Sequence, residues 1–213
     1  MGQKIAVLDY GLGNLRSVSK AIEHVAPEAE VRVTDDHDWI RAADRVVFPG
    51  QGAARDCMAA IGEHHLNQAI REAVQSKPFL GICMGLQVLL DFSEENAGTE
   101  LLGIVPGRVV RFADDMPGEN ELPLKIPHMG WSRVEQVQPH PLWEGIEDGS
   151  RFYFVHSYYV VPDEEEVVAG VTEYGVRFAS ALARENLFAV QFHPEKSADA
   201  GLRLLKNFVG WNP

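Results

Sequence analysis

The fold is decided by the segment Pro78-Phe-Leu-Gly-Ile-Cys-Met-Gly-Leu-Gln87. An apolar run leads into Cys83, which stands between Gly81 and Gly85, and helix-like apolar spacing follows. This is a Gly-x-Cys-x-Gly form of the nucleophile elbow, a tight turn from a strand to a helix in which flanking glycines remove Cβ clashes. The pattern predicts a reactive thiol at the end of a buried strand. A free cysteine is more often a small buried side chain, so this segment alone leaves that alternative open.

Strands and helices also alternate on both sides of this segment. An apolar run at residues 5–8 predicts a buried strand, and apolar residues recur at helical spacing over 15–25. Such alternation predicts an α/β fold with an open, mostly parallel sheet flanked by helices. After about residue 98, short alternating segments predict added antiparallel strands in the C-terminal half. We expect residues 1–213 to form a single domain.

The charge and the cysteine count narrow the class of protein. With 19 Lys and Arg against 31 Asp and Glu, the net charge is −12, which argues against nucleic acid as the main partner. Two cysteines, Cys57 and Cys83, make no disulfide framework and favour the reduced cytoplasm. The sequence has neither an apolar run of 18 residues nor a secretory signal pattern, so we expect no membrane segment. Cys57 is interpreted as a buried structural side chain.

Metal and dinucleotide sites find little support in the sequence. The eight histidines include no HExxH pattern, and no paired CxxC is present. The segment Gly11-Leu-Gly-Asn14 follows the first expected strand, but Arg16 stands where a dinucleotide-binding fingerprint needs its third glycine. We therefore expect no metal ion and no cofactor.

A base for the thiol is expected in the segment Val190-Gln-Phe-His-Pro-Glu195. His193 ends an apolar run, and Pro194 favours an extended backbone before it. In extended geometry Glu195 projects to the same side as His193 and can orient its imidazole. A lone histidine is more often structural, and the combination with Cys83 favours the catalytic interpretation.

The segment Phe48-Pro-Gly-Gln-Gly-Ala53 predicts a second part of the site. A glycine-rich loop at the carboxyl end of a parallel strand is where open α/β sheets bind ligands. The backbone N–H groups of Gly50, Gln51 and Gly52, with that of Met84, could face a developing oxyanion. A plain strand-to-helix turn remains the alternative for this loop.

Together these segments resemble the class I (triad-type) glutamine amidotransferases, whose fold is flavodoxin-like. The matching motifs are the elbow, the loop Pro49-Gly-Gln-Gly52 and the segment Phe192-His-Pro-Glu195. Within the class, the chain looks like the glutaminase subunits of imidazole glycerol phosphate synthase. The motifs that carry this narrower resemblance are Asp9-Tyr-Gly-Leu-Gly-Asn-Leu15, Pro127-His-Met-Gly-Trp131, Phe154-Val-His-Ser-Tyr-Tyr159 and His193-Pro-Glu-Lys-Ser197.

The resemblance implies a reaction and a role for each matching residue. Cys83 would attack the side-chain amide of glutamine, His193 would transfer protons, and Glu195 would orient His193. The products are glutamate and ammonia. Contacts to bound glutamine are implied for five residues: Gln87, Glu95, His156, Ser157 and Tyr158.

The resemblance also implies a protein partner and a pathway. Ammonia would pass to the cyclase subunit HisF in a heterodimer of histidine biosynthesis. The residues that match interface segments of the family are His128, Met129, Trp131 and Lys196. Relatives tend to be weak glutaminases until the partner binds, and we hypothesise the same here, with the loop at 50–52 as the switch.

Three alternatives remain at this stage. The chain could serve another synthase, such as the anthranilate or aminodeoxychorismate enzymes. It could be a γ-glutamyl peptidase with the same thiol triad, or a non-enzymatic flavodoxin-like module in which Cys83 is structural.

Overall fold

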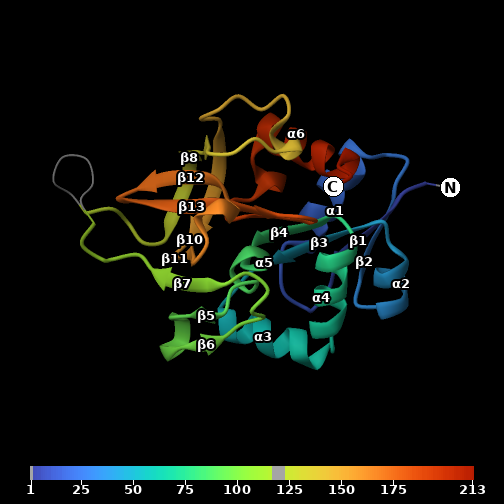
Figure 1. The fold of residues 1–213 in the computed structure, drawn as a ribbon, viewed down its shortest axis with the longest axis horizontal. Helices are drawn as coiled ribbons and strands as arrows, with labels where there is room; N and C mark the ends of the chain where they lie inside the picture. Colours follow the sequence, from blue (N-terminus) through green and yellow to red (C-terminus); the bar gives the residue numbers. More distant parts are fainter. Residues whose placement is uncertain (1, 117–122) are drawn as a thin grey trace.

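A mixed β-sheet forms the centre of the computed structural model, which describes residues 2–116 and 123–213 (Figure 1). One part of the sheet is parallel. Its strands are β1 (Lys4–Leu8), β2 (Glu30–Thr34), β3 (Arg45–Gly50), β4 (Phe79–Cys83) and β14 (Leu187–Val190).

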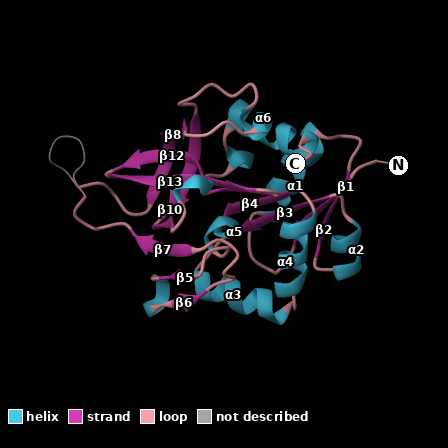
Figure 2. Ribbon diagram, viewed as in Figure 1, coloured by secondary structure: helices cyan, strands magenta, loops and turns pink. Residues whose placement is uncertain are grey.

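Antiparallel strands continue the sheet. They are β13 (Val176–Arg184), β11 (Tyr158–Pro162), β7 (Gly107–Arg111), β12 (Val168–Tyr174), β9 (Glu135–Gln136), β5 (Phe92–Ser93) and β6 (Thr99–Glu100), with β5 parallel to β7. The main path runs β2-β1-β3-β4-β14-β13-β11-β7-β5-β6, and β12 pairs with β13 and β9. A separate antiparallel pair is formed by β8 (His128–Arg133) and β10 (Arg151–His156). Figure 2 shows these later strands gathered at the end of the molecule opposite β2.

Helices cover both faces of the parallel part (Figure 1). Helices α1 (Leu15–Val25) and α6 (Ala198–Gly210) pack together on one face. The other face is covered by α2 (His37–Ala42), α3 (Ala54–Glu63) and α4 (Asn67–Ser76). Short helical turns complete the described elements: α5 (Met84–Gln87), η1 (Glu95–Ala97), η3 (Pro141–Trp143), η4 (Glu165–Val167) and η5 (Pro194–Lys196). No helix of the described ranges combines the length and the apolar character that crossing a membrane requires.

Two hydrophobic cores, one on each face of the sheet, explain the unbroken apolar run of β1 from Ile5 to Leu8, whereas the edge strand β2 exposes Glu30 and Arg32. In β1, Ile5 and Val7 pack into the core under α1 and α6, whereas Ala6 and Leu8 pack into the core on the other face. Successive strand residues point to opposite faces, so a strand covered on both sides needs apolar residues throughout. Full burial of such a side chain contributes about 1.5–3 kcal/mol. The predicted α/β fold with added antiparallel strands is confirmed.

The parallel strands bring distant segments to one edge of the sheet. Pairing of β3 with β4 sets Gly50 opposite Cys83, and pairing of β4 with β14 sets Ile82 opposite Val190. The carboxyl ends of these strands therefore meet, which is where open α/β sheets form sites. The spacing of Leu86, Val88, Leu89 and Leu90 predicts a helical segment after the cysteine; the helix α5 ends earlier, at Gln87, and has 4 residues.

Candidate active site

Cys83 is held in a strained backbone conformation at the end of β4. Its φ is 57° and its ψ is −110°, a region that costs a non-glycine residue of order 1–3 kcal/mol. Both neighbouring glycines are required by contact: a Cβ on Gly85 would overlap the carbonyl oxygen of Phe48, and one on Gly81 would lie 2.7 Å from the Gly85 oxygen. The chain therefore has the elbow geometry that the sequence predicted, with Cys83 at its apex.

His193 and Glu195 lie side by side behind this elbow. The Nδ1 atom of His193 is 2.9 Å from Oε1 of Glu195, and the two side chains are 3% and 0% exposed. The backbone of His193 is fixed as well, because its N–H donates to Tyr153 O and its carbonyl accepts from Ser197 Oγ. His193 is extended, as the following proline predicts, with φ of −103° and ψ of 95°, but Glu195 reaches its ring from the turn η5 and not from an extended segment. The contact itself is as expected.

The electrostatics of His193 favour its protonated form. Burial alone would lower the pKa of His193, but interactions with the Cys83 thiol and the Glu195 carboxylate outweigh burial and raise it to about 10. Within the described residues, the other ring nitrogen, Nε2, has no hydrogen-bond partner. The imidazole can therefore hold on Nε2 the proton that leaves the thiol, while Nδ1–H donates to Glu195.

Two polar side chains that sequence analysis missed complete this arrangement. Asn14 donates from Nδ2 to the same Glu195 oxygen at 3.3 Å. Gln191 is fully buried, and its Nε2 atom lies 3.7 Å from Cys83 Sγ. Each belongs to a segment that the motifs had already marked, Asp9–Leu15 and Val190–Glu195. The signal was adjacency to those motifs, but neither contact could be derived from spacing.

Two hydrogen bonds to backbone carbonyl groups, those of Pro49 and Gln51, hold the loop at residues 50–52 in place. Tyr10 donates its hydroxyl to Pro49 O at 2.9 Å, and the Cys57 thiol donates to Gln51 O at 3.3 Å. Burial raises the pKa of Cys57 to about 12, so this thiol keeps its proton. Since a trans peptide points its N–H opposite to its C=O, the Gly52 N–H is directed away from Cys57. Gly52 adopts a φ of +96°, which favours glycine at this position.

A cavity of about 420 Å³ opens above Cys83 and His193. It is also lined by most of the other residues that the sequence analysis selected: Gln51, Gly52, Met84, Gln87, Glu95, His156, Ser157, Tyr158 and Lys196. A volume of this size accommodates a small-molecule substrate. Gly50 and Glu195 are not among the lining residues; Gly50 lies under Met84, and Glu195 lies behind His193.

Two of the residues expected to contact glutamine are engaged in structural contacts as well. Glu95 accepts the Ala54 N–H at 2.7 Å and so stabilises the start of α3. His156 donates from Nδ1 to Tyr158 O at 2.8 Å and, through its other nitrogen, contacts His128 at 2.9 Å. Burial lowers the pKa of His156 to about 3 and that of His128 to about 4, so both rings are neutral near pH 7.

The four residues expected at the partner interface separate into two groups. Met129 and Trp131 on β8 are 62% and 49% exposed, and Lys196 is exposed at the cavity rim. His128 is 1% exposed and stacks on Tyr174, with 3.9 Å between ring centroids. The His128 side chain is therefore buried in this chain, and the exposed residues of its segment are Met129 and Trp131. Strand alternation explains the difference, because His128 points inward where Met129 points outward.

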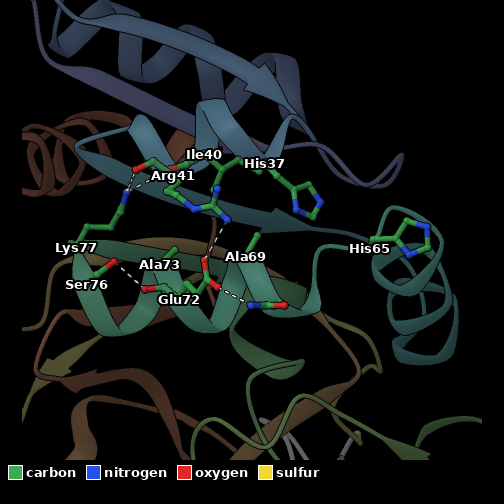
Figure 3. A pocket seen from close by; sticks show the side chains of 10 residues that line it. His37, Ile40, Arg41, His65, Ala69, Glu72, Ala73, Ser76 and Lys77 are labelled. Atoms are coloured by element: carbon green, nitrogen blue, oxygen red, sulfur yellow. Dashed lines mark hydrogen bonds and ion pairs between the residues drawn. The ribbon is translucent and has the colours of Figure 1, made fainter.

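A second cavity, of about 380 Å³, lies between α2 and α4 (Figure 3). Its Lys77 ammonium group donates to the carbonyl oxygens of Ile40, Arg41 and Ala43 at the end of α2. The Arg41 guanidinium group is 3.7 Å from Glu72. Lys77 is thus bonded to backbone carbonyl groups and Arg41 lies near Glu72, so both side chains join the two helices, and we take the cavity above Cys83 as the candidate active site.

Comparison with known proteins agrees with this geometry. Residues 6–210 match the family "Glutamine amidotransferase class-I", and the chain therefore belongs to the class I glutamine amidotransferases. Among similar proteins, the imidazole glycerol phosphate synthase subunit HisH of Thiobacillus denitrificans is 61% identical over 100% of this chain and 93% of its own length. HisH of Methylococcus capsulatus is 57% identical over 98% of this chain and 97% of its own. Within its class, the chain belongs to the HisH family.

Solved structures show the same fold at low identity. PurLQS from Thermotoga maritima superimposes with a TM-score of 0.74 and 17% identity, covering 99% of both chains. A glutamine amidotransferase from the same organism gives a TM-score of 0.63 and 16% identity, over 94% of this chain and 79% of that chain. These likenesses support the fold alone.

Proposed function

We propose that Cys83, His193 and Glu195 form the catalytic triad through which this chain hydrolyses glutamine for imidazole glycerol phosphate synthase. The HisH family makes the chain a glutamine amidotransferase of histidine biosynthesis. The observation that carries the triad is the position of a strained cysteine beside a buried, Glu195-oriented histidine at one cavity. We further propose that residues 1–213 act as one cytoplasmic glutaminase unit.

The reaction proceeds in two halves. The Cys83 sulfur attacks the side-chain carbonyl carbon of glutamine, and His193 Nε2 takes the thiol proton. When the C–N bond breaks, His193 returns a proton to the leaving nitrogen, ammonia departs, and a γ-glutamyl thioester remains. A water molecule, deprotonated by His193, attacks the thioester carbon; the C–S bond breaks, and glutamate and the free thiol result.

The negative oxygen that forms in both halves needs N–H donors. Met84, Gln51 and Gly52 line the cavity beside Cys83, and we assign the oxyanion contacts to the backbone N–H groups of Met84 and of the 50–52 loop. Glutamine itself would contact Glu95, His156, Ser157 and Tyr158 around the cavity. Gln87 reaches the cavity wall, but its amide nitrogen is bonded to Tyr158 O and to Gln191.

The proposed partner is a cyclase subunit of the HisF type. The surface of this chain that binds the partner would include Met129 and Trp131, with Lys196 at the cavity mouth. Trp131 contacts the ring of Tyr153, with 6.1 Å between centroids, and the Lys196 ammonium group lies 5.9 Å from the same ring. A partner on this surface would cover the cavity and keep ammonia from water, which is needed because ammonia reacts only while unprotonated. Partner binding would also shift the 50–52 loop to the conformation that binds the oxyanion, and this shift would raise the glutaminase rate.

Glutamate production tests this function. The purified chain is assayed with glutamine alone and then with a HisF-type cyclase and its nucleotide substrate. Strong stimulation by both supports the proposal. Equal activity with and without the partner would be consistent with the thiol triad but would favour free hydrolysis or service to another synthase. No activity under either condition would favour the non-enzymatic module.

A further inference from the structure

A buried glutamine faces the sulfur of the nucleophile. Gln191 follows β14, has no solvent exposure, and places Nε2 at 3.7 Å from Cys83 Sγ. A buried amide costs free energy unless its groups are hydrogen-bonded, so its partners define what it does. One of those partners is the atom that reacts.

The orientation of the Gln191 amide, that is, which end faces Cys83, follows from its hydrogen bond to Gln87, which is itself bonded to the backbone carbonyl of Tyr158. The carbonyl oxygen of Tyr158 can only accept, so the Gln87 atom at 3.0 Å from it must be the NH₂ nitrogen. That nitrogen also donates to the Gln191 side chain at 2.9 Å, which must therefore present its oxygen. The remaining end of Gln191, its NH₂ group, then faces Cys83. This chain of hydrogen bonds excludes the flipped amide, which would put oxygen against the sulfur.

We propose that Gln191 is a further catalytic residue, which donates an amide N–H to the Cys83 sulfur and stabilises the thiolate, with Gln87 as the positioning residue that fixes the direction of that amide. This inference rests on the proposed function, because it assigns a donor to the same nucleophile. A donor stabilises the charged thiolate more than the neutral thiol, so it favours the form that attacks glutamine.

The other titratable groups around Cys83 come from three other segments. His193 provides the cation, with Glu195 beyond it. Tyr10, after β1, and Cys57 on α3 also interact electrostatically with Cys83. Burial raises the pKa of the Tyr10 hydroxyl and that of Cys57, to about 12 for Cys57, so both stay protonated between pH 5 and about 9. Over that range Tyr10 and Cys57 therefore add no charge beside Cys83, and Gln191 is a neutral donor beside the pair of Cys83 and His193.

The test is the pH dependence of Cys83 alkylation by iodoacetamide, followed by mass spectrometry of the Cys83 peptide in the full chain. Gln191→Met keeps the length of the side chain and removes the donor. We expect the midpoint of the alkylation profile to rise by about one pH unit in this variant. With the cyclase partner bound, kcat for glutamine should fall about tenfold at neutral pH while KM changes less than twofold.

A second variant and a matched control keep the outcome decisive. Gln87→Met removes the hydrogen bond that fixes the Gln191 amide and should move the midpoint of the alkylation profile in the same direction by a smaller amount. This variant also provides the test if Gln191→Met does not fold. The exposed Gln68→Met on α4 should leave it unchanged. An unchanged midpoint in the folded Gln87 and Gln191 variants would overturn the role of Gln191 while the triad stands. A wild-type Cys83 that is not alkylated across the range would instead contradict the proposed function.

Discussion

Asn14 donates a hydrogen bond to Glu195 across 181 residues of sequence, at 3.3 Å, and the oxygen it contacts is the one that faces His193. An amide can hold a carboxylate in place without neutralising it. The segment after β1 thereby joins the C-terminal turn that carries the proposed acid–base pair. The second oxygen of Glu195 is buried and, in the described residues, has no hydrogen-bond partner.

Glu195→Gln should lower kcat by on the order of 10²-fold, less than the loss of the thiol itself. The amide keeps the volume but can turn its NH₂ group toward Nδ1 and favour the wrong imidazole tautomer. Steady-state glutaminase kinetics in the complex measure the effect. Near-wild-type kcat would mean that another group orients His193. Glu166→Gln in the turn η4, away from the site, is the control.

Gly85→Ala should destabilise the fold by about 3 kcal/mol or more, because the added methyl group would overlap the Phe48 carbonyl group. Gly62→Ala on α3 is the matched control. It meets nothing within 4 Å, so it should leave stability unchanged or raise it by about 0.5–1 kcal/mol. Urea unfolding of both variants gives the comparison. Equal midpoints for the two would refute the close contact at the elbow.

Stability should fall as the solution is acidified below about pH 6.5. The pKa of buried His156 is lowered in the folded state, to about 3, so the unfolded chain binds a proton that the folded chain does not. Its contribution is complete above the unfolded pKa and decreases toward low pH, by roughly 2 kcal/mol between pH 6.5 and 5. Urea unfolding at both pH values measures it.

A non-titrating replacement checks the cause of that acid sensitivity. His156→Gln keeps a donor for Tyr158 O and should reduce the slope of stability against pH over this range. Burial also lowers the pKa of His128 and that of His140 to about 4, so these two residues keep the remaining slope. His65→Gln, at an exposed position, should keep the wild-type slope. Identical slopes for all three proteins would assign the effect to other groups.

Trp131→Ala should weaken binding of the cyclase partner by at least about tenfold, because exposed aromatic side chains are frequent hot spots of interfaces. Val137→Ala, which is also on the exposed surface at 43%, should have little effect. Calorimetric titration of the partner into each variant gives the dissociation constants. Equal affinities would place the docking surface elsewhere.

Local motifs predicted the parts of the site that depend on neighbours in sequence. The elbow at Cys83 and the pair of His193 and Glu195 lie where short-range rules place them, since strand ends and turns are set by nearby glycine and proline. The two-sided burial of β1 was likewise readable from its unbroken apolar run.

Contacts that depend on the order of strands in the sheet could not be predicted from the sequence patterns. Gln191 meets Cys83 because β14 inserts beside β4, and no spacing within either segment reveals that pairing. The inward direction of His128 required the pairing of β8 with β10, since a shift of one residue would reverse it. Sequence patterns identified the groups, and packing decided which of them touch.

The most direct test of the central claim uses Cys83→Ala in the complex with its cyclase, assayed with glutamine and separately with ammonium salts as the nitrogen source. The account predicts that glutamine-dependent synthesis falls by about 10⁴-fold or more while ammonia-dependent synthesis is retained. Glutamine-dependent synthesis that survives in this variant would contradict the assignment of Cys83 as the nucleophile.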